Sequence, residues 1–477
     1  MRDYIIFYLN GEKRTVKGEK VFLTLSEYLR YDQNLTGTKV VCAEGDCGAC
    51  TVLAARIRPC GENKPAQFEF QTLNSCINFL FLMDGCHIVT VEGLKENGEL
   101  HPVQKAVRDH YGAQCGFCTP GFVASITGFF EDKKEATHAD IKKHCSGNLC
   151  RCTGYKPILE AALSVNPQTV TTLRERYYDS GQVGELLEHV KIPVSIRSEG
   201  RSFHAPLTFE EALRLRKVYG DLKVFSGATD LGVQVNKGKL EAANILSLNL
   251  IPELYGIGSD GGFINIGAKA TLSEAEKYFE DRIPEISSLL NLFASPQIRN
   301  VGTVSGNVAN ASPIGDMIPA LLALDAQVHL ESKDGGGRIV KLDKFFLGYR
   351  KTDLGDDEII RQVSIPHPKQ GAIFKIYKVS KRKDLDISTL SAAFYLEMNN
   401  TVISRARIAY GGVSPYARRI YSAENHAVGR KFDMDLMKEL SDIIGGEVTP
   451  ISDMRALSSY RRRVSGNLLF KFYQETH

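Results

Sequence analysis

The chain has 477 residues, of which 43% are apolar and 24% are charged, and its formal net charge at neutral pH is +3. This length predicts roughly three domains, and the composition is that of an ordinary globular protein. A charge this close to neutral gives no sign of nucleic acid or an anionic membrane as a partner. The basic runs at residues 381–383 and 461–463 are more typical of a solvated surface than of a nucleic-acid site. No apolar run approaches the roughly 20 residues that span a bilayer.

The first residues do not have the pattern of a signal peptide, because the apolar run at residues 4–9 is short and ends in the turn dipeptide Asn10-Gly11. We therefore expect a cytoplasmic protein. In that compartment the eleven cysteines are expected to bind metal rather than to form disulfides. Eight of them fall into two spaced sets, and the other three are expected to be free thiols: Cys60, Cys86 and Cys145.

The first cysteine set lies in a loop of small residues. Its spacing, C-x4-C-x2-C with a fourth cysteine 26 positions later, is that of plant-type [2Fe–2S] ferredoxins, in which the last thiolate arrives from a distance. A cluster with bridging sulfides needs a tightly wrapped loop, and Gly45, Gly48 and Ala49 let the backbone approach and direct N–H groups at the sulfurs. The set consists of Cys42, Cys47, Cys50 and Cys76.

The surrounding sequence predicts a compact α+β domain over residues 1–92. Strands at residues 4–9 and 13–16 are joined by Asn10-Gly11, which favours a type I′ hairpin turn. The other elements are expected as a short capped helix at residues 27–30 and strands at 51–57, 68–73 and 87–91.

Residues 93–165 differ in having apolar residues at helical spacing, and they predict a unit of four short helices. The helices are expected at residues 103–111, 122–130, 138–144 and 157–163. The second cysteine set has the pattern C-x2-C and C-x-C, separated by 31 residues, and falls at or between helix ends, where loops can gather four thiolates. It consists of Cys115, Cys118, Cys150 and Cys152.

Two kinds of metal site suit a set of four cysteines. Zinc is the usual occupant, and C-x2-C is its normal half-site, but C-x-C is not. Spacing alone therefore leaves zinc and an iron–sulfur cluster about equally favoured. The plant-type pattern just upstream shifts the balance toward iron–sulfur, because electron carriers work in series.

The remaining sequence predicts a linker and then mixed α/β structure. Residues 166–190 are polar without sustained periodicity, which predicts a linker with helix only near 184–190. Residues 191–370 are mixed α/β, and in residues 371–477 strands precede helices. Helices are expected at residues 209–219, 283–293, 436–444 and 459–472, and strands at 222–225, 264–268, 374–378, 390–397 and 402–410.

Three loops are candidates for binding a nucleotide. The string Gly256-x-Gly258-x-x-Gly261 is followed by a strand where a dinucleotide fingerprint requires a helix, which predicts a plain turn. Residues 225–231 end a strand with small and hydroxyl residues, whose N–H groups suit an anion-binding nest. Residues 300–316 are rich in glycine, hydroxyl and amide groups. Together, downstream of two metal sites, these last two loops favour a flavin, which converts one-electron chemistry into hydride chemistry.

Three longer motifs connect the chain to a known family: CAEGDCGAC at residues 42–50, QCGFCTPG at 114–121 and GNLCRCTGY at 147–155. On these motifs the chain resembles the small iron–sulfur/flavin subunits of bacterial two-subunit xanthine dehydrogenases, in the molybdenum hydroxylase family. The resemblance covers nearly the whole chain and implies a [2Fe–2S] cluster, not zinc, at the second cysteine set. One departure is Cys145, where the family pattern has an apolar residue.

The resemblance also implies a domain plan. Residues 1–92 would be a β-grasp plant-type ferredoxin domain and residues 93–165 a helical [2Fe–2S] domain. A PCMH-type FAD-binding domain at 191–370 and a CO-dehydrogenase-flavoprotein-like subdomain at 371–477 would follow the linker. FAD contacts are implied for Val224, Phe225, Ser226, Gly227, Ala228, Thr229, Asp230, Leu231, Gly302, Thr303, Ser305, Gly306, Asn307, Ser312, Asp316 and Lys378.

Three single residues receive roles from the same resemblance. Gln114 would contact the pterin of the molybdenum cofactor in a partner subunit. The motifs GYRKT at residues 348–352 and YKVSKRKDLDIS at 377–388 match further family patterns. By that match Lys378 would lie near the isoalloxazine, where it stabilises negative charge on the reduced flavin or positions the nicotinamide, and Asp386 would lie near the flavin site.

The activity implied is an electron relay. This sequence contains no molybdopterin domain, so a molybdopterin-binding large subunit is expected as partner, in an α2β2 heterotetramer. Electrons would pass from its molybdenum centre to the second cluster, the first cluster, FAD and then NAD⁺, while hypoxanthine and xanthine are oxidised to urate.

Two alternatives stay open. The partner's substrate would be an aldehyde, an aromatic CoA ester or an N-heterocycle if the chain served another molybdenum hydroxylase. A stand-alone electron-transfer flavoprotein is the other alternative, and Gln114 argues against it, since a pterin contact has no purpose without a partner.

Overall fold

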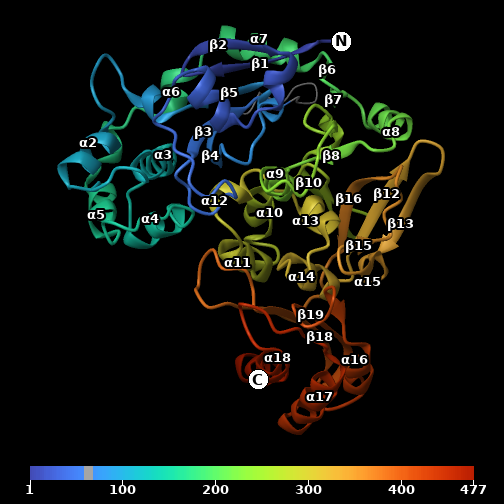
Figure 1. Ribbon diagram of the computed structural model, residues 1–477. Coiled ribbons are helices and arrows are strands. Elements are labelled where there is room, and N and C mark those ends of the chain that lie inside the picture. The colour runs from blue at the N-terminus through green and yellow to red at the C-terminus, as the bar shows by residue number, and fades with distance from the viewer. Residues whose placement is uncertain (59–67) are drawn as a thin grey trace. The chain divides into compact units, whose positions relative to one another are not determined.

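The computed structural model describes residues 1–58 and 68–477 (Figure 1). Its packing divides the chain into two compact units: Met1–Glu253 with Ser295–Gly302, and Leu254–Ala294 with Thr303–His477. Both units combine helices with sheets, which confirms the predicted multidomain α+β class. Cys60, expected to be a free thiol, lies outside the described residues. Across those residues, no helix has both the length and the hydrophobicity to cross a bilayer.

The N-terminal sheet of the first unit has the strand order β2-β1-β5-β3-β4. The strands are β1 Tyr4–Leu9, β2 Glu12–Lys17, β3 Thr51–Arg56, β4 Phe70–Asn74 and β5 Cys86–Val89. The hairpin of β1 and β2 turns at Asn10 and Gly11, with φ of 52° and 88°, as a type I′ turn requires. The sequence predicted these strands with bounds that differ by one or two residues.

Short helical segments connect strands of this sheet or follow its last strand. They are η1 Gly18–Phe22, α1 Leu25–Glu27, η2 Tyr28–Asp32, η3 Leu80–Met83 and η4 Val91–Leu94. The four expected helices come next, as α2 Pro102–Asp109, α3 Thr119–Phe130, α4 His138–His144 and α5 Lys156–Ser164. A proline occupies the first or second position of α2, α3 and α5. Backbone N–H groups at these positions have no partner within the helix, so the missing N–H of proline costs no hydrogen bond.

Strand β1 is apolar on both faces because both faces of its sheet are covered. Ile5, Phe7 and Leu9 belong to one hydrophobic core, whereas Ile6 and Tyr8 belong to another, which also contains side chains of α2 and α3. Side chains alternate between the faces of a strand, so a sheet buried on both sides needs a continuous apolar run. The helical segment therefore packs on one face of the ferredoxin-like sheet.

Residues 166–190 are more ordered than the expected linker. They contain η5 Pro167–Thr169, α6 Leu173–Tyr177 and α7 Ser180–Val190. The Tyr8 hydroxyl donates a 2.6 Å hydrogen bond to Glu185 of α7, and the Tyr177 hydroxyl donates a 2.7 Å bond to the Gly93 carbonyl. Helix α7 extends the helix expected near 184–190, whereas α6 is not predicted because it is short and its start is marked mainly by the side-chain cap of Thr172.

A second sheet in the first unit has the order β6-β7-β9-β8. Its strands are β6 Val194–Ser198, β7 Arg201–Ala205, β8 Lys223–Phe225 and β9 Asn244–Ser247, and its helices are α8 Phe209–Val218 and α9 Thr229–Asn236. Phe203 and Phe225 pack on Phe81 with ring centroids 4.9 and 5.5 Å away, which joins this sheet to the first core. Helix α12, Pro296–Arg299, also packs in this unit.

The second unit begins with a sheet of order β10-β11-β16-β12-β13 and a small two-stranded sheet. The strands are β10 Ile257–Asp260, β11 Phe263–Gly267, β12 Gln327–Ser332, β13 Gly336–Lys341, β14 Phe346–Gly348, β15 Lys351–Thr352 and β16 Ile359–Pro366. The helices are α10 Leu272–Phe279, α11 Pro284–Leu292, α13 Val304–Asn310, α14 Met317–Ala323 and α15 Leu342–Phe345. Within residues 256–261, Ile257–Asp260 form β10 and Gly261 begins the turn to β11, so a strand follows the string as expected, although most of the string is itself strand and not turn.

The C-terminal part of the second unit is a sheet of order β17-β18-β19-β20 with helices packed on it. Its elements are β17 Ile373–Val379, β18 Leu390–Asn399, β19 Val402–Gly411, β20 Arg418–Arg419, α16 Tyr421–Ala427, α17 Met434–Glu447 and α18 Ser458–Thr476. The predicted order of strands before helices is confirmed in this region.

Candidate functional site

The first cysteine set converges on one point. The sulfurs of Cys50 and Cys76 are 3.2 Å apart, and the sulfur of Cys42 lies within hydrogen-bond range of Cys47 and Cys76. A disulfide requires about 2.05 Å between sulfurs, so these are four free thiols. Four free thiols gathered in this way are the donor set that a [2Fe–2S] cluster needs.

Two backbone segments bring these thiols together. Three of the cysteines come from the loop before β3, and Cys76 follows β4, which pairs with β3. In the loop, Gly45 and Gly48 have φ of 81° and 67°. A Cβ on Gly48 would also lie 2.2 Å from the carbonyl oxygen of Gly147. Both the positive φ and this close contact therefore require glycine at position 48.

The second cysteine set also gathers at helix ends. The sulfurs of Cys115 and Cys152 are 3.5 Å apart, and Cys118 lies within hydrogen-bond range of Cys150. Cys118 is the N-cap of α3, and Cys150 and Cys152 lie between α4 and α5. The N–H of Thr153 donates to the Cys150 sulfur at 3.4 Å. Four thiols without a disulfide are the ligand types of an iron–sulfur cluster, and the residue types alone would suit zinc as well.

The two sets differ in exposure. Cys50 and Cys76 are buried, whereas Cys115 and Cys152 are exposed. Exposed apolar side chains surround the second set, namely Phe117, Leu149 and Tyr155. Gln114, predicted to contact a partner's pterin, is also exposed and precedes Cys115. The second set is therefore the more outward-facing of the two, although Cys150 is buried and Cys42 and Cys47 are half-buried.

The first predicted flavin loop connects β8 to α9. Ala228 has a φ of 59° and is the N-cap of α9. A Cβ on Gly227 would lie 2.3 Å from the Val301 carbonyl oxygen and 2.8 Å from Gly302, so the structure brings this loop against the start of the second flavin segment. Val224 and Phe225 lie in β8, and Thr229, Asp230 and Leu231 in the first turn of α9.

Helix α9 also contacts the first cysteine set. The Asn236 side-chain amide donates to the carbonyl oxygens of Ala43 and Cys76 at 2.9 and 2.8 Å. A Cβ on Gly232 would lie 2.3 Å from the Ile77 carbonyl oxygen. The helix that follows the first flavin loop is therefore packed directly on the first cysteine loop. Sequence analysis missed these contacts, because they join residues more than 150 positions apart.

The second predicted flavin segment is largely helical, which differs from the expected loop. The side chain of Thr303 accepts a 3.0 Å hydrogen bond from Gly306 N–H and caps α13. Ser305 Oγ and Asn307 Oδ1 are buried without a hydrogen-bond partner among the described residues. Buried polar atoms are nearly always paired, so these two atoms fit the hydroxyl and N–H groups of a bound flavin. Ser312 instead accepts a bond from Ile314 N–H at 3.4 Å.

Asp316 and Lys378, both predicted site residues, form a buried ion pair in the second unit. The Lys378 ammonium lies 2.5 Å from Asp316 Oδ2, and the side chains are 4% and 5% exposed. The Ser388 hydroxyl, which sequence analysis did not single out, donates to the other Asp316 oxygen at 2.5 Å. The carboxylate is therefore fixed from both sides, and it holds the lysine in one position.

The predicted residue Asp386 makes a different pair. Its carboxylate accepts hydrogen bonds from the Arg382 side chain and backbone N–H, both at 2.8 Å. Burial alone would raise the pKa of Asp386, but the bonds from Arg382 outweigh it, and the pKa lies below its ordinary value. Lys378 adds a smaller effect of the same sign, although its direct ion pair is with Asp316.

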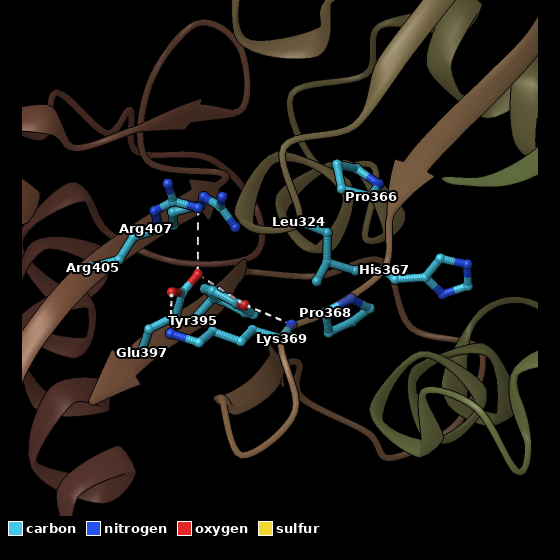
Figure 2. A pocket seen from close by; sticks show the side chains of 9 residues that line it. All are labelled: Leu324, Pro366, His367, Pro368, Lys369, Tyr395, Glu397, Arg405 and Arg407. Carbon is cyan, nitrogen blue, oxygen red and sulfur yellow. Dashed lines mark hydrogen bonds and ion pairs between the residues drawn. The ribbon is translucent and has the colours of Figure 1, made fainter. Parts of the chain in front are cut away.

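A pocket of about 240 Å³ lies in the second unit, beside the connection from β16 to β17 (Figure 2). Its charged side chains are already paired: Glu397 lies 3.4 Å from both Lys369 and Arg405. Glu397 and Arg405 are cross-strand neighbours on β18 and β19, so they form an ordinary ion-pair ladder. The pocket contains none of the predicted site residues.

Four sequence families match the chain in succession. A "2Fe-2S iron-sulfur cluster binding domain" matches residues 7–79, and a "[2Fe-2S] binding domain" matches residues 90–163. An "FAD binding domain in molybdopterin dehydrogenase" matches residues 197–368, and a "CO dehydrogenase flavoprotein C-terminal domain" matches residues 375–476.

Similar proteins include eukaryotic xanthine dehydrogenases. The chain is 29% identical to xanthine dehydrogenase 1 of Arabidopsis thaliana over 538 residues, which is 98% of this chain and 39% of that protein. It is 30% identical to xanthine dehydrogenase of Emericella nidulans over 487 residues, covering 90% of this chain and 35% of that protein. The chain thus spans less than two fifths of the length of these relatives.

Solved structures are similar over part of the chain. Carbon monoxide dehydrogenase from Hydrogenophaga pseudoflava matches with a TM-score of 0.55 and 27% identity, covering 59% of this chain and 96% of that one. Quinoline 2-oxidoreductase from Pseudomonas putida 86 matches with a TM-score of 0.53 and 23% identity, covering 59% and 99%, and that likeness is one of fold.

Two [2Fe–2S] domains followed by an FAD-binding domain define an electron-transfer iron–sulfur flavoprotein. The chain belongs to the molybdenum hydroxylase family, as the iron–sulfur/FAD component of such an enzyme.

Proposed function

We propose that the chain is the small subunit of a xanthine dehydrogenase, which carries electrons from a partner's molybdenum centre to NAD⁺ while hypoxanthine and xanthine are oxidised to urate. The observation that carries this proposal is the similarity to xanthine dehydrogenases along 98% of the chain. The matching families also supply the two clusters and the flavin that such a relay requires.

The proposed direction of the relay rests on exposure and contacts. The outward-facing set, with Cys115 and Cys152, would hold the cluster that receives electrons from the partner. The inward-facing set, with Cys50 and Cys76, would hold the next cluster, since α9 joins its loop to the first flavin loop through Asn236. Electrons would therefore pass from the second cluster to the first and then to FAD.

The residues of this chain would prepare the sites in distinct ways. The cysteine sets would hold the clusters, which supply one-electron transfer, and the flavin would couple it to hydride transfer. Ser305 and Asn307 would bind polar groups of FAD with their unpartnered oxygens. Lys378 would place a positive charge beside the isoalloxazine, and Asp316 and Ser388 would keep it there. Asp386, held by Arg382, would border the same site.

The proposed partner is a molybdopterin-binding large subunit in an α2β2 heterotetramer in the cytoplasm. Its docking surface would be the exposed apolar rim of the second cysteine set, formed by Phe117, Leu149 and Tyr155. Exposed side chains of this size suit the core of a protein interface. Gln114 would contact the pterin from this surface. The domain boundaries after residues 92, 165, 190 and 370 belong to the same proposal.

A second candidate is the electron-transfer component of another molybdenum hydroxylase. The similarity to carbon monoxide dehydrogenase at 27% identity supports it. The cysteine sets and flavin segments would work in the same way, because the substrate binds in the partner. Only the partner's substrate and the final electron acceptor distinguish the two candidates.

The experiment is purification of the chain together with its natural partners, followed by measurement of molybdenum, iron and flavin. We expect a complex that contains molybdenum and reduces NAD⁺ with xanthine. A molybdenum complex that is inactive with xanthine but active with an aldehyde or N-heterocycle would favour the second candidate. A chain that purifies alone, with no molybdenum in any complex, would contradict both.

A further inference from the structure

Gln297 lies on α12, a short helix whose segment, Ser295–Gly302, packs in the first unit although its sequence neighbours on both sides belong to the second. The Ser295 side chain caps the helix by accepting a bond from Ile298 N–H at 3.3 Å. Gln297 is 1% exposed, so its amide group is removed from water. A buried amide group needs hydrogen-bond partners, because burying it without them is energetically costly.

The amide nitrogen of Gln297 faces three acceptors. It lies 2.9 Å from Asn148 Oδ1, 3.2 Å from Ser125 Oγ and 3.3 Å from Thr51 Oγ1. Each partner is close in sequence to cysteine ligands. Thr51 follows Cys50, Asn148 precedes Cys150 by two positions, and Ser125 is on α3, which begins after Cys118.

The partners of Gln297 are in turn bonded to one another. The Asn148 amide donates to the Gly48 carbonyl oxygen at 3.0 Å, and the Ser125 hydroxyl donates to Asn148 Oδ1 at 2.7 Å. The hydroxyl of Thr51 donates to the same Gly48 oxygen at 2.6 Å. Gln297 thus completes one buried network that contains the Gly48 backbone of the first cysteine loop and the Asn148 side chain of the second. Networks of this kind select a single arrangement of the groups they join.

Three glycines close the remaining space around this network. A Cβ on Gly147 would lie 2.0 Å from Gln297 Oε1, and one on Gly121 would lie 2.1 Å from the Gly48 carbonyl oxygen. One on Gly48 would lie 2.2 Å from the Gly147 oxygen. The loops and α3 are therefore in backbone contact, with the glutamine amide between them. These contacts explain a glycine in each of the three cysteine motifs.

The network also contains an unpaired group. Gln297 Oε1 is buried against Gly147 and has no hydrogen-bond partner among the described residues. An unpaired buried oxygen costs about 1–3 kcal/mol, and an apolar side chain of the same length would avoid that cost. Stability alone therefore does not explain a glutamine at position 297. The hydrogen bonds donated by its amide N–H groups, which join the two loops, explain it better.

We propose that Gln297 is a positioning residue that fixes the separation of the two clusters, and so sets the rate of electron transfer between them. The inference rests on the proposed relay. A residue from the flavin-binding sequence would thereby lock both cysteine loops in the geometry that electron transfer requires.

The test compares the complete complex carrying Gln297→Met with wild type. Methionine keeps the length of the side chain but cannot donate a hydrogen bond. Gln362→Met is the matched control, because Gln362 also donates to side chains, those of Asn265 and Ser364, but belongs to the second unit, whereas both cysteine sets belong to the first. Iron content, melting temperature and the magnetic dipolar coupling between the two clusters after reduction with dithionite are measured, together with the rate of flavin reduction.

We expect Gln297→Met to keep both clusters, to give a weaker or broader dipolar coupling, and to slow flavin reduction about 10- to 100-fold, as is usual for outer-sphere partners of metal ligands. The control should leave coupling and rate unchanged. If Gln297→Met contains both clusters and its dipolar coupling equals that of wild type, the proposal is wrong. A variant with a lower melting temperature but an unchanged coupling and rate would also overturn it. Dithionite reduces the clusters without substrate, so the coupling is informative even if the complex proves inactive with xanthine.

Discussion

The backbone N–H of Leu149 donates a 3.0 Å hydrogen bond to the carbonyl oxygen of Cys47. Leu149 precedes Cys150, so this single bond connects Cys47 of one cysteine set to the immediate neighbour of a cysteine in the other. The two loops come from different structural elements, one before β3 and one between α4 and α5. Their direct contact is the feature that makes a relay between two clusters physically reasonable.

Gly48→Ala should disrupt this contact. Gly48 has a φ of 67°, and an added Cβ would lie 2.2 Å from the Gly147 carbonyl oxygen. Backbone strain and overpacking together should lower the free energy of unfolding by roughly 2–5 kcal/mol. Chemical denaturation and iron content measure the effect.

Gly184→Ala is the matched control for that substitution. Gly184 lies inside α7 with nothing within 4 Å of an added Cβ, so alanine should leave iron content unchanged and raise stability by up to about 1 kcal/mol. Equal behaviour of the two variants would contradict the close-packing account of Gly48.

Asp316→Asn should strongly destabilise the second unit. The substitution leaves the Lys378 ammonium buried without its counter-charge, a change that typically costs about 3–5 kcal/mol. Asp386→Asn removes an aspartate whose arginine partner, Arg382, is 67% exposed, and should cost less than about 1 kcal/mol. Urea denaturation of both variants gives the comparison. A cost for Asp316→Asn as small as that for Asp386→Asn would show that the buried pair is not organised as described.

His87 should make the protein less stable in acid. Burial lowers the pKa of His87 from 6.5 to about 4, and its Nε2 accepts a hydrogen bond from Gly11 N–H at 3.2 Å. A depressed pKa contributes stability that is present above pH 6.5 and is lost as the pH falls through 4, by roughly 3 kcal/mol in total. In His87→Gln, which keeps an acceptor but does not titrate, the unfolding free energy should fall less between pH 6.5 and 4. An identical pH dependence in both proteins would exclude His87 as a source.

Local signals in the sequence were sufficient for much of the fold. The Asn10-Gly11 turn, the four short helices and the C-terminal strands follow from turn chemistry and periodicity, which depend on neighbours in the chain. Helix α6 and the first turn of α7 are not predicted, because the segment is short and polar and burial of residues such as Val183 stabilises the helix. The glycine and asparagine after Thr303 disfavour helix and predict a loop, yet burial of Val304 and Val308 makes this segment helical.

Local sequence signals likewise predicted part of the candidate site, but not the contacts between its parts. The cysteine spacings predicted two sets of ligands, and the structure brings each set together. What spacing could not predict is how the sets meet one another and the flavin segments. Gln297 bonds to residues 149 and 246 positions away, and Asn236 bonds to the first loop across 193 positions. Such contacts arise from the packing of whole domains, and no local pattern encodes them.

Cys47→Ser should leave reduction of the partner's molybdenum intact while slowing reduction of the flavin. The substitution removes one thiol from the first set and leaves the second set intact. In the assembled complex, xanthine should still reduce the partner's molybdenum, but reduction of the flavin should slow strongly. Cys86→Ala is the control, since Cys86 is a buried thiol in β5 whose pKa is raised by burial, and it belongs to neither set.

Rapid mixing of the anaerobic complex with xanthine, while molybdenum and flavin reduction are followed separately, tests the account most directly. The account predicts that Cys47→Ser leaves molybdenum reduction at the wild-type rate and slows flavin reduction, with Cys86→Ala like wild type at both. Flavin reduction in Cys47→Ser at the wild-type rate would contradict the proposed order of electron transfer.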